Sequence, residues 1–443
     1  MSASPPTLDD WTRAALGLLK GKPLASLTTT VDGVCLEPLY ASRLASSPES
    51  PRAWSDGPFD GSVSADITVD AVRFAREGAS GALELGLALA DLTDAFRALE
   101  TSGRAPADGA PTVEVQLATG RDLLANIAKI RAVRVLWSKW LVALHLPDSA
   151  VRIRATTGVT TQSIRDPWNN LVRSTFEVAG AVLGGADAVF VTPHDALLGG
   201  SDLGRRLAWT LPTVLREEAH LTASAADGAY AVLAATDGLA RAAWAEFQRI
   251  EGLGGLSAVA KELPGWLAAA RGAREAALAR RRESIVGVSD FAPVADAIPE
   301  APVSSFREGA QWEALARTAK AANAAIFLAN LGDRQAWSAR AEWAHRLFEA
   351  GGFAVHVSGG FEDDAALATA FRLSGAQGAI LCGADADYPA RLPGASAALL
   401  ASGAQFLVLA GNPKERAAEY TALGIPYAVY VGAEVLGALL KVA

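Results

Sequence analysis

Short runs of apolar residues recur through the last third of the chain, and each is followed by a segment with apolar residues at helical spacing. Short apolar runs that alternate with helices are typical of parallel strands buried on both faces of a sheet. The pattern predicts an α/β domain with a flavodoxin-like doubly wound sheet over residues 323–443. The predicted strands are AIFLAN (325–330), FAVHV (353–357), GAILCG (378–383), QFLVLAG (405–411) and YAVYVG (427–432).

The first part of the chain shows a similar alternation of strand-like and helix-like segments. Such alternation indicates parallel strands joined by crossover helices, either in a (β/α) TIM-type barrel or in an open sheet. The pattern does not decide between the two. The predicted strands are 82–89, 112–118, 151–158 and 188–193, and the predicted helices are 11–19, a helix ending at Leu99, 122–144, 170–183 and several helices within 205–282.

Turn and linker residues mark where these segments end. Asp32-Gly33 predicts a hairpin within residues 24–40, because both residues tolerate positive φ angles. Gly252 is predicted to end the helix in AAWAEFQRIEGLGG. The proline-rich stretch 289–306 is the predicted domain linker. The resulting division is a first domain at 1–290, a linker and helix at 291–322, and a second domain at 323–443.

Composition narrows the class of protein. The chain is 51% hydrophobic and 20% charged with a net charge of −8, and it lacks the clustered Lys and Arg that nucleic acid or an anionic membrane would attract. No apolar stretch is long enough to span a bilayer and the N-terminus lacks a signal-peptide pattern, so we expect a cytoplasmic protein. Cys35 and Cys382 lie far apart in apolar surroundings and are predicted to be buried thiols.

Two E-x-x-H pairs raise the question of a metal site. Glu217 with His220, and Glu342 with His345, have the spacing that di-iron bundles use. The pairs lie in different predicted domains and lack the further glutamates that such a site needs. Ordinary polar pairs on helix faces are the favoured interpretation, and no metal site is predicted.

Other polar groups have structural explanations. His194 and Asp195 follow the predicted strand at 188–193, where barrel active sites are built, but loop capping is the favoured interpretation. Asp166-Pro167 predicts a helix start. The strip REAALARRRES (274–284) reads as a basic, solvated helix face.

A series of motifs resembles the barrel domain of methylmalonyl-CoA mutases, in the order of that family. The resemblance implies a (β/α) TIM-type barrel followed by a flavodoxin-like, cobalamin-binding-type domain. Because the chain between Tyr40 and residue 126 is much shorter than in the family, residues 1–290 are predicted to form a shortened, incomplete barrel. The motifs are VDGVCLEPLY (31–40), NIAKIRAVRVLWSKW (126–140), ATTGVTTQSIRDPWNNLVRSTFEVAGAVLGGADAVFVTPHDALLG (155–199), RRLAWTLPTVLREEAHL (205–221), DGAYAVLAATDGLARAAWAEFQRIEGLGG (227–255) and RRRESIVGV (280–288).

The cofactor positions of the family are altered in this chain. The family's D-x-H-x-x-G loop supplies the His that coordinates cobalt, and its three positions fall on Gln335, Trp337 and Arg340. Other corrinoid contacts of the family correspond to LCGAD (381–385) and to Ala410-Gly411. The Trp337 indole is expected to lie in the channel that the cobalamin tail occupies in the family. This chain is therefore expected to bind no cofactor.

The catalytic positions of the barrel are missing as well. Catalytic members use a barrel His on the thioester carbonyl and a Tyr against the corrin. This chain has no histidine before His145 and no tyrosine between Tyr40 and Tyr230. No catalytic residue is predicted.

The resemblance points to a small (β) subunit of methylmalonyl-CoA mutase, an isomerase subunit that is inactive alone. Its expected partner is the catalytic large (α) subunit, which binds adenosylcobalamin and isomerises (R)-methylmalonyl-CoA to succinyl-CoA. An incomplete barrel exposes strand edges and so favours an interface with another chain. Two alternatives stay open: a self-sufficient adenosylcobalamin-dependent acyl-CoA mutase, and an adaptor that docks a cobalamin-loading chaperone.

Overall fold

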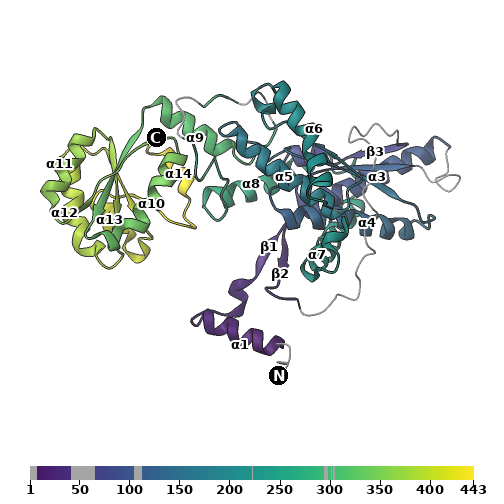
Figure 1. The fold of residues 1–443 in the computed structure, drawn as a ribbon, viewed down its shortest axis with the longest axis horizontal. Coiled ribbons are helices and arrows are strands. Elements are labelled where there is room, and N and C mark those ends of the chain that lie inside the picture. Colours follow the sequence, from purple (N-terminus) through teal and green to yellow (C-terminus); the bar gives the residue numbers. More distant parts are fainter. Residues whose placement is uncertain are drawn as a thin grey trace. The chain divides into compact units, whose positions relative to one another are not determined.

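The computed structural model describes residues 7–40, 65–103, 112–221, 223–293, 298–300, 302 and 305–443, whose course is drawn in Figure 1. The chain forms two compact units. The N-terminal unit consists of Met1–Thr161 and Leu171–Arg271, and the C-terminal unit consists of Gln162–Asn170 and Gly272–Ala443. The domains predicted from the sequence, 1–290 and 323–443 with a linker and helix between them, stay a prediction.

The C-terminal unit contains a parallel sheet with the strand order β12-β11-β10-β7-β8, and the short β9 pairs with the end of β7. Without β9, and with the strands numbered 1 to 5 along the chain from β7, the order from β8 to β12 is 2-1-3-4-5. This is the order of flavodoxin-like doubly wound sheets. All five predicted strands are present. They are β7 Ala325–Leu331, β8 Ala354–His356, β10 Gly378–Cys382, β11 Phe406–Ala410 and β12 Tyr427–Val429, with β9 at Gly360–Phe361.

Both faces of this sheet are covered. Ile326 and Ile380 lie in one apolar cluster with helices α9, α10 and α14, whereas Phe327 and Leu381 lie in a second cluster with α11, α12 and α13. Burial on both faces explains why the strands are continuous apolar runs. The helices are α9 Ala310–Ala321, α10 Arg334–Ala350, α11 Asp364–Ser374, α12 Tyr388–Ala401, α13 Ala417–Ala422 and α14 Val435–Leu440.

The N-terminal unit contains a four-stranded parallel sheet with the order β3-β4-β5-β6. Three of its strands, β4 Val113–Ala118, β5 Val151–Thr156 and β6 Ala188–Phe190, fall where strands are predicted. Within the described ranges these four strands form an open sheet, and the incomplete barrel stays a prediction. The first strand is β3 Ile67–Asp70, and the helices are α2 Val72–Arg76, α3 Gly81–Thr101, α4 Leu123–Ala143, α5 Pro167–Gly184, α6 Asp202–Glu217, α7 Tyr230–Gly252 and α8 Leu263–Ala279.

The prediction of a strand at 82–89 is wrong, because these residues belong to helix α3. The run ALELGLAL contains no β-branched residue, and Leu and Ala favour helices. Helix α3 packs against α7, α4 and β3, so its apolar residues are buried around most of its circumference. The sequence of this helix therefore lacks the spacing of apolar residues that marks a helix with one buried face.

The N-terminal hairpin is confirmed, with one correction. Strands β1 Thr29–Val31 and β2 Val34–Leu36 pair antiparallel, and Asp32 and Gly33 have φ angles of 46° and 81°. Cys35 is exposed, so the prediction that it is a buried thiol is wrong. Neighbouring residues of a strand point to opposite faces. In β2 the side chain of Leu36 points to the buried face, so that of Cys35 points to solvent. Helix α1, Leu8–Leu18, begins slightly before the predicted residue 11 because Thr7 and Asp10 form a capping box.

One further local prediction is confirmed and one needs correction. Helix α7 ends at Gly252 as predicted, and the left-handed residues of the turn that follows are Gly254 and Gly255, with φ of 104° and 91°. The amide of Gly255 donates to the carbonyl of Ile250 at 3.1 Å, as in a Schellman motif. The basic strip 274–284 is not wholly solvated, because Arg281 is buried and forms an ion pair with Asp290 at 2.9 Å.

The two cysteines should differ in reactivity. Cys382 lies in the core, and burial raises the pKa of its thiol to about 12, so almost no thiolate forms at neutral pH. We expect a disulfide reagent such as DTNB to titrate only Cys35 in the native protein and both thiols in guanidinium chloride. The Cys35→Ser variant is the control: a thiol that still reacts quickly in its native state would contradict burial of Cys382.

Candidate functional site

The carboxyl ends of β7, β10 and β11 form the edge where doubly wound folds bind ligands. Sequence reasoning placed Gln335, Trp337 and Arg340 in a loop after β7, but they lie in the first turns of α10. The helix begins early because the Asp333 side chain accepts a hydrogen bond from the Ala336 amide at 2.9 Å. The structure brings Trp337 and Arg340 to the carboxyl edge, whereas Gln335 is exposed to solvent.

Arg340 binds the backbone of the neighbouring strand ends. Its guanidinium donates to the carbonyl of Gly383 at 2.8 Å and to the carbonyl of Ala410 at 3.3 Å. It also forms an ion pair with Asp385 at 2.6 Å. A guanidinium presents several donors in one plane, so a single side chain satisfies acceptors from two strands. Arg340 thereby ties the ends of β10 and β11 together.

Tyr388 completes this arrangement, although the sequence analysis did not single it out. Its hydroxyl donates to the carbonyl of Ala410 at 2.7 Å and accepts from the amide of Gly383 at 3.0 Å. Burial raises the pKa of the Tyr388 phenol to about 12, so the hydroxyl stays protonated. The Arg340 guanidinium carbon lies 5.3 Å from the centre of its ring. No local sequence pattern marks Tyr388, because the groups that it binds, at Gly383 and Ala410, follow two different strands.

Trp337 covers the other side of the same edge. The indole is half-buried and packs against the cluster that contains α10 and α14. A Cβ atom added to Gly360 would lie 2.5 Å from the indole Nε1 and would overlap the carbonyl oxygen of Gly332. The close approach of the ring therefore requires a residue without a side chain at position 360.

Ala410 and Gly411 lie under the Arg340 guanidinium. Ala410 is buried, and a Cβ atom at Gly411 would lie 3.0 Å from a guanidinium nitrogen of Arg340. The backbone of Gly411 has a φ of 152°, which residues with a side chain rarely adopt. The glycine leaves room for a side chain of this same protein.

A polar hollow of about 310 Å³ lies between the loops that follow β10 and β11. Its lining carries both signs of charge, with Asp385 and Glu415 beside Lys414 and Arg416. In the ranges that the structure describes, no group of three or more His, Cys, Asp and Glu side chains is placed to hold a metal ion. The hollow has no charge preference that would select a ligand class.

The carboxyl edge of the N-terminal sheet is closed by buried charged residues that sequence reasoning missed. Lys129 donates to Glu84 at 2.8 Å and to the carbonyl of Ala118 at 2.6 Å. Burial raises the pKa of Glu84, and the positive charge of Lys129 opposes that shift. Glu84 was hidden because its segment was interpreted as a strand.

Glu177 performs a similar role next to this pair. Its carboxylate accepts hydrogen bonds from the hydroxyl of Thr119 at 3.0 Å, the amide of Gly158 at 2.7 Å and the hydroxyl of Thr161 at 2.5 Å. Each carboxylate oxygen is thus engaged by the ends of β4 and β5. The arrangement fixes these loops and leaves no oxygen of Glu177 directed at a ligand.

The remaining candidates have structural surroundings. His194 is buried, and the Asp195 carboxylate accepts from the amide and hydroxyl of Ser201 at 2.9 and 2.5 Å, which is a loop cap. Pro167 is the first residue of α5, and Asp166 accepts from the Asn169 side chain at 2.6 Å, in agreement with the predicted helix start.

Neither E-x-x-H pair forms a joint site. Glu217 ends helix α6 and pairs with Arg216, whereas His220 lies beyond the helix with a φ of 48°. His345 lies 3.1 Å from Glu349, one turn further along α10. These contacts agree with the interpretation of both pairs as ordinary polar groups.

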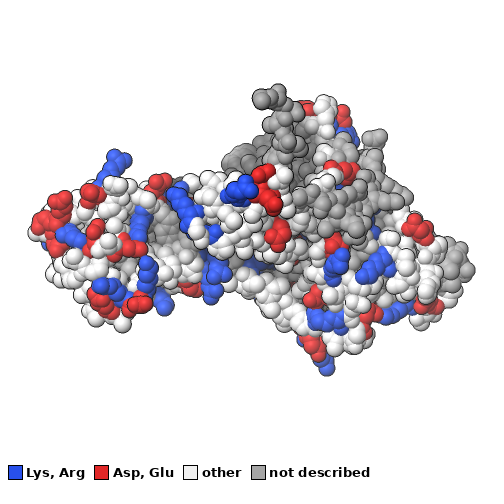
Figure 2. Space-filling model, turned by 90° about the horizontal axis from the view of Figure 1, so that it is seen from below, with Lys and Arg blue, Asp and Glu red and all other residues white. Residues whose placement is uncertain are grey.

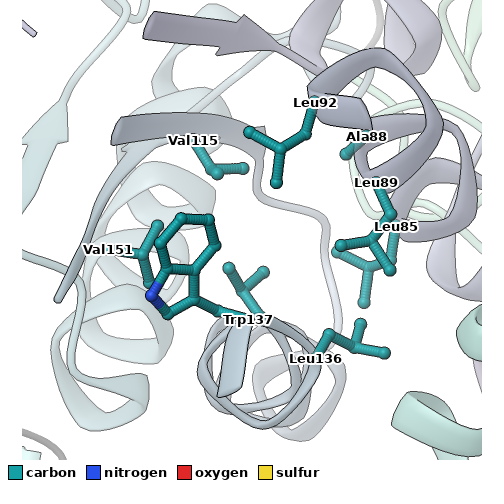
Figure 3. Close-up of a pocket in the computed structure, with 9 residues that line it drawn as sticks. Leu85, Ala88, Leu89, Leu92, Val115, Leu136, Trp137 and Val151 are labelled. Atoms are coloured by element: carbon teal, nitrogen blue, oxygen red, sulfur yellow. The ribbon is translucent and has the colours of Figure 1, made fainter. Parts of the chain in front are cut away.

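Figure 3 shows an apolar pocket of about 20 Å³ between α3, α4, β4 and β5. It has room for little more than a water molecule and offers no polar partners, so it is a packing gap. On the face drawn in Figure 2, Lys and Arg are interspersed with Asp and Glu, without a broad basic patch. No helix in the described part of the chain has the length and apolar character needed to cross a bilayer.

The packing of Trp337 on Gly360 predicts that a side chain at position 360, but not at position 359, destabilises the protein. We expect Gly360→Ala to lower the free energy of unfolding by about 1–3 kcal/mol, because the new methyl group overlaps its neighbours. Gly359→Ala is the matched control, since nothing lies within 4 Å of its added Cβ atom. Chemical denaturation of both variants checks this, and equal stabilities would show that the indole does not rest on Gly360.

Because the ion pair of Lys129 and Glu84 is buried, the loss of one partner should cost more than the loss of both. Lys129→Met leaves the Glu84 carboxylate buried without its partner and should cost about 3–5 kcal/mol in urea denaturation. The double variant Lys129→Met/Glu84→Leu should recover part of this loss. Arg241→Met is the control, because its ion pair with Asp237 is exposed and should contribute about 0–1 kcal/mol. Equal effects of Lys129→Met and Arg241→Met would contradict the role of the pair.

Comparison with known proteins bears out the resemblance found in the motifs. The family model described as methylmalonyl-CoA mutase matches residues 63–347. The "Methylmalonyl-CoA mutase small subunit" of Streptomyces virginiae is 38% identical over 368 residues, which cover 78% of this chain and 60% of the relative. The protein of the same name from Propionibacterium freudenreichii subsp. shermanii is 30% identical over 370 residues, covering 79% and 58%.

A third relative gives the same result. The "Probable methylmalonyl-CoA mutase small subunit" of Mycobacterium bovis is 32% identical over 371 residues, which cover 79% of this chain and 60% of the relative. The chain therefore spans about 60% of the length of these curated relatives. Because the family model covers more than half of the sequence, the chain belongs to the methylmalonyl-CoA mutase family.

Proposed function

We propose that this chain is a non-catalytic small subunit of a methylmalonyl-CoA mutase. Its partner is a catalytic large subunit, which isomerises (R)-methylmalonyl-CoA to succinyl-CoA with adenosylcobalamin in a cytoplasmic heterodimer. The chain contributes structure to that complex and no catalytic group. A shortened barrel followed by a cobalamin-binding-type domain without cofactor is part of this proposal.

The observation that carries the proposal is the occupation of the C-terminal carboxyl edge by the chain's own side chains. Arg340 and Tyr388 use the backbone groups of Gly383 and Ala410 that a ligand would otherwise meet. Arg340 is held there by Asp385 as well. A corrinoid tail at this edge would have to displace an ion pair and several hydrogen bonds. The closed edge therefore favours a subunit that leaves the cofactor to its partner.

The residue at the position of the family's cobalt ligand does not fit a corrinoid. An indole nitrogen is a hydrogen-bond donor only and offers no lone pair to a metal ion, unlike the neutral imidazole of histidine. The ring of Trp337 also packs on the cluster that contains α10 and α14, and its Nε1 is shielded from solvent. We derive no step through cobalamin for this chain.

The relatives support the same interpretation through their names. Three of them carry the words "small subunit", and such a name presupposes a larger partner. The match covers only about 60% of the length of these relatives, so the complex that this chain forms is itself part of the proposal. The self-sufficient mutase is disfavoured by the closed edge. The chaperone-docking adaptor has no specific observation in its favour.

Co-expression with a candidate large subunit from the same genome tests the proposal. We expect the two chains to co-purify, and mutase activity with (R)-methylmalonyl-CoA to require the large subunit. This chain alone, incubated with adenosylcobalamin and passed through gel filtration, should carry no corrin absorption. Corrin absorption that elutes with this chain, or isomerisation by it alone, would overturn the proposal and support the self-sufficient mutase.

A variant at the closed edge sharpens the test. Arg340→Met removes the contacts with Gly383, Ala410 and Asp385, which in our proposal are structural. We expect the complex with this variant to keep wild-type kcat and KM while the melting temperature of the free chain falls. Leu373→Met, at a surface residue of α11, is the control for stability. A tenfold loss of kcat at unchanged stability would assign Arg340 a role in the reaction.

A further inference from the structure

The four-stranded sheet of the N-terminal unit has one apolar face and one polar face. Alternate residues such as Val69, Val115 and Ile153 lie in the apolar core with residues of α3, α4 and α7. The opposite face carries two rows of polar side chains. In register across β3, β4 and β5, these rows are Asp70, Gln116 and Arg154, and Thr68, Glu114 and Arg152.

This asymmetry restricts how the parallel strands are connected. Purely parallel sheets are covered by crossover helices on both faces in doubly wound folds, and on one face only in barrels. Here the helices that contribute to the core accompany the apolar strand residues, and the polar rows lie outside that core. The sheet is therefore built like a segment of a (β/α) barrel, with its polar face toward the interior.

Both edges of the segment are open among the described residues. Strands β3 and β6 each pair on one side only, so they present backbone N–H and C=O groups without strand partners there. The β6 edge also exposes apolar surface. Phe190 at the end of β6 is 55% exposed, and Phe176 on α5 and Trp209 on α6, the helices before and after β6, are 56% and 60% exposed.

We propose that two copies of this chain close a single eight-stranded (β/α) barrel, each supplying four strands. A two-fold axis along the barrel places β6 of each copy beside β3 of the other in parallel orientation. Four strands are half of the number in this type of barrel, so two copies close the ring without leaving an edge. The interior site of the barrel is incomplete in one copy.

The charges on the polar face are compatible with this closure. Each half brings Asp70 and Glu114 on β3 and β4, and Arg152 and Arg154 on β5, so the interior gains equal numbers of both signs. Glu114 already pairs with Arg152 at 3.2 Å and with Arg154 at 3.1 Å. In the ring, β5 of one copy is separated from β3 of the other only by β6, which contributes the small Ala188 in the row of Arg154. In the proposed ring, Arg154 of one copy thus approaches Asp70 of the other copy.

A second copy fits the open edges better than other occupants. The missing half must supply four parallel strands with helices on their outer side, and a chain whose own barrel is complete has no strand edge to offer. A single extended peptide would cover one edge and leave the other open. The proposal goes beyond the small-subunit function and does not depend on it, since it concerns this chain by itself.

Molar mass in solution tests the proposal directly. Light scattering after gel filtration should give about twice the 45.8 kDa of one chain for the purified wild type. Phe190→Lys places a charge at the junction and should reduce the mass to that of one chain. Leu373→Lys, at an 84% exposed residue of α11 in the other unit, is the matched control and should stay dimeric. A monomeric wild type overturns the proposal, whether or not a large subunit binds.

Crosslinking distinguishes this junction from other dimers. In a Cys35→Ser background, Phe190→Cys and Thr68→Cys chains with different tags are co-expressed and treated with a short bis-maleimide. Only the mixed pair should crosslink, because position 190 of one copy lies beside β3 of the other and far from its own symmetry mate. Crosslinking of the Phe190→Cys chain with itself would indicate antiparallel pairing of β6 edges and would refute the closed barrel.

Discussion

Backbone groups at the carboxyl ends of parallel strands impose the constraint on which both units of this protein depend. Where neighbouring strands stop, their last amides and carbonyls lose strand partners in a place that is largely out of water. A buried group without a hydrogen bond costs about 1–3 kcal/mol. In the C-terminal unit Arg340 and Tyr388 satisfy these groups, and in the N-terminal unit Lys129 and Glu177 do so.

The same constraint connects structure with function. In doubly wound folds a ligand occupies the carboxyl edge and meets these backbone groups. In the proposed function, a chain that leaves the ligand to its partner must find other hydrogen-bond partners for these backbone groups. The guanidinium of Arg340 fits this need because it reaches two strand ends at once and is itself neutralised by Asp385. In the proposed function, a cofactor could bind at this edge only by displacing these contacts of Arg340.

The sequence predicted the C-terminal sheet well because strands buried on both faces are short continuous apolar runs. It failed at residues 82–89, because a helix buried on most sides is also a continuous apolar run and periodicity cannot separate the two. Glu84 was lost with that error. The counterparts of the family's cofactor positions were assigned by counting from a family motif, and that assignment stays a prediction. Tyr388, by contrast, acts through contacts between strand ends that are distant in sequence, and no local pattern reports them.

In the proposed shortened barrel, the polar face of the N-terminal sheet would explain why the loss of strands is tolerated. When strands are removed from a barrel with an apolar interior, the remaining strands expose a large apolar surface, and each square ångström costs about 25 cal/mol. Here the polar face carries Arg152 and Arg154, which are partly exposed to water, and the buried Glu114 is paired with both of them. The cost of shortening is therefore concentrated at the two strand edges and at exposed apolar side chains such as Phe190. Strand pairing with another chain removes that cost without any change in the core, so the physical pressure on such a protein is toward assembly and not toward refolding.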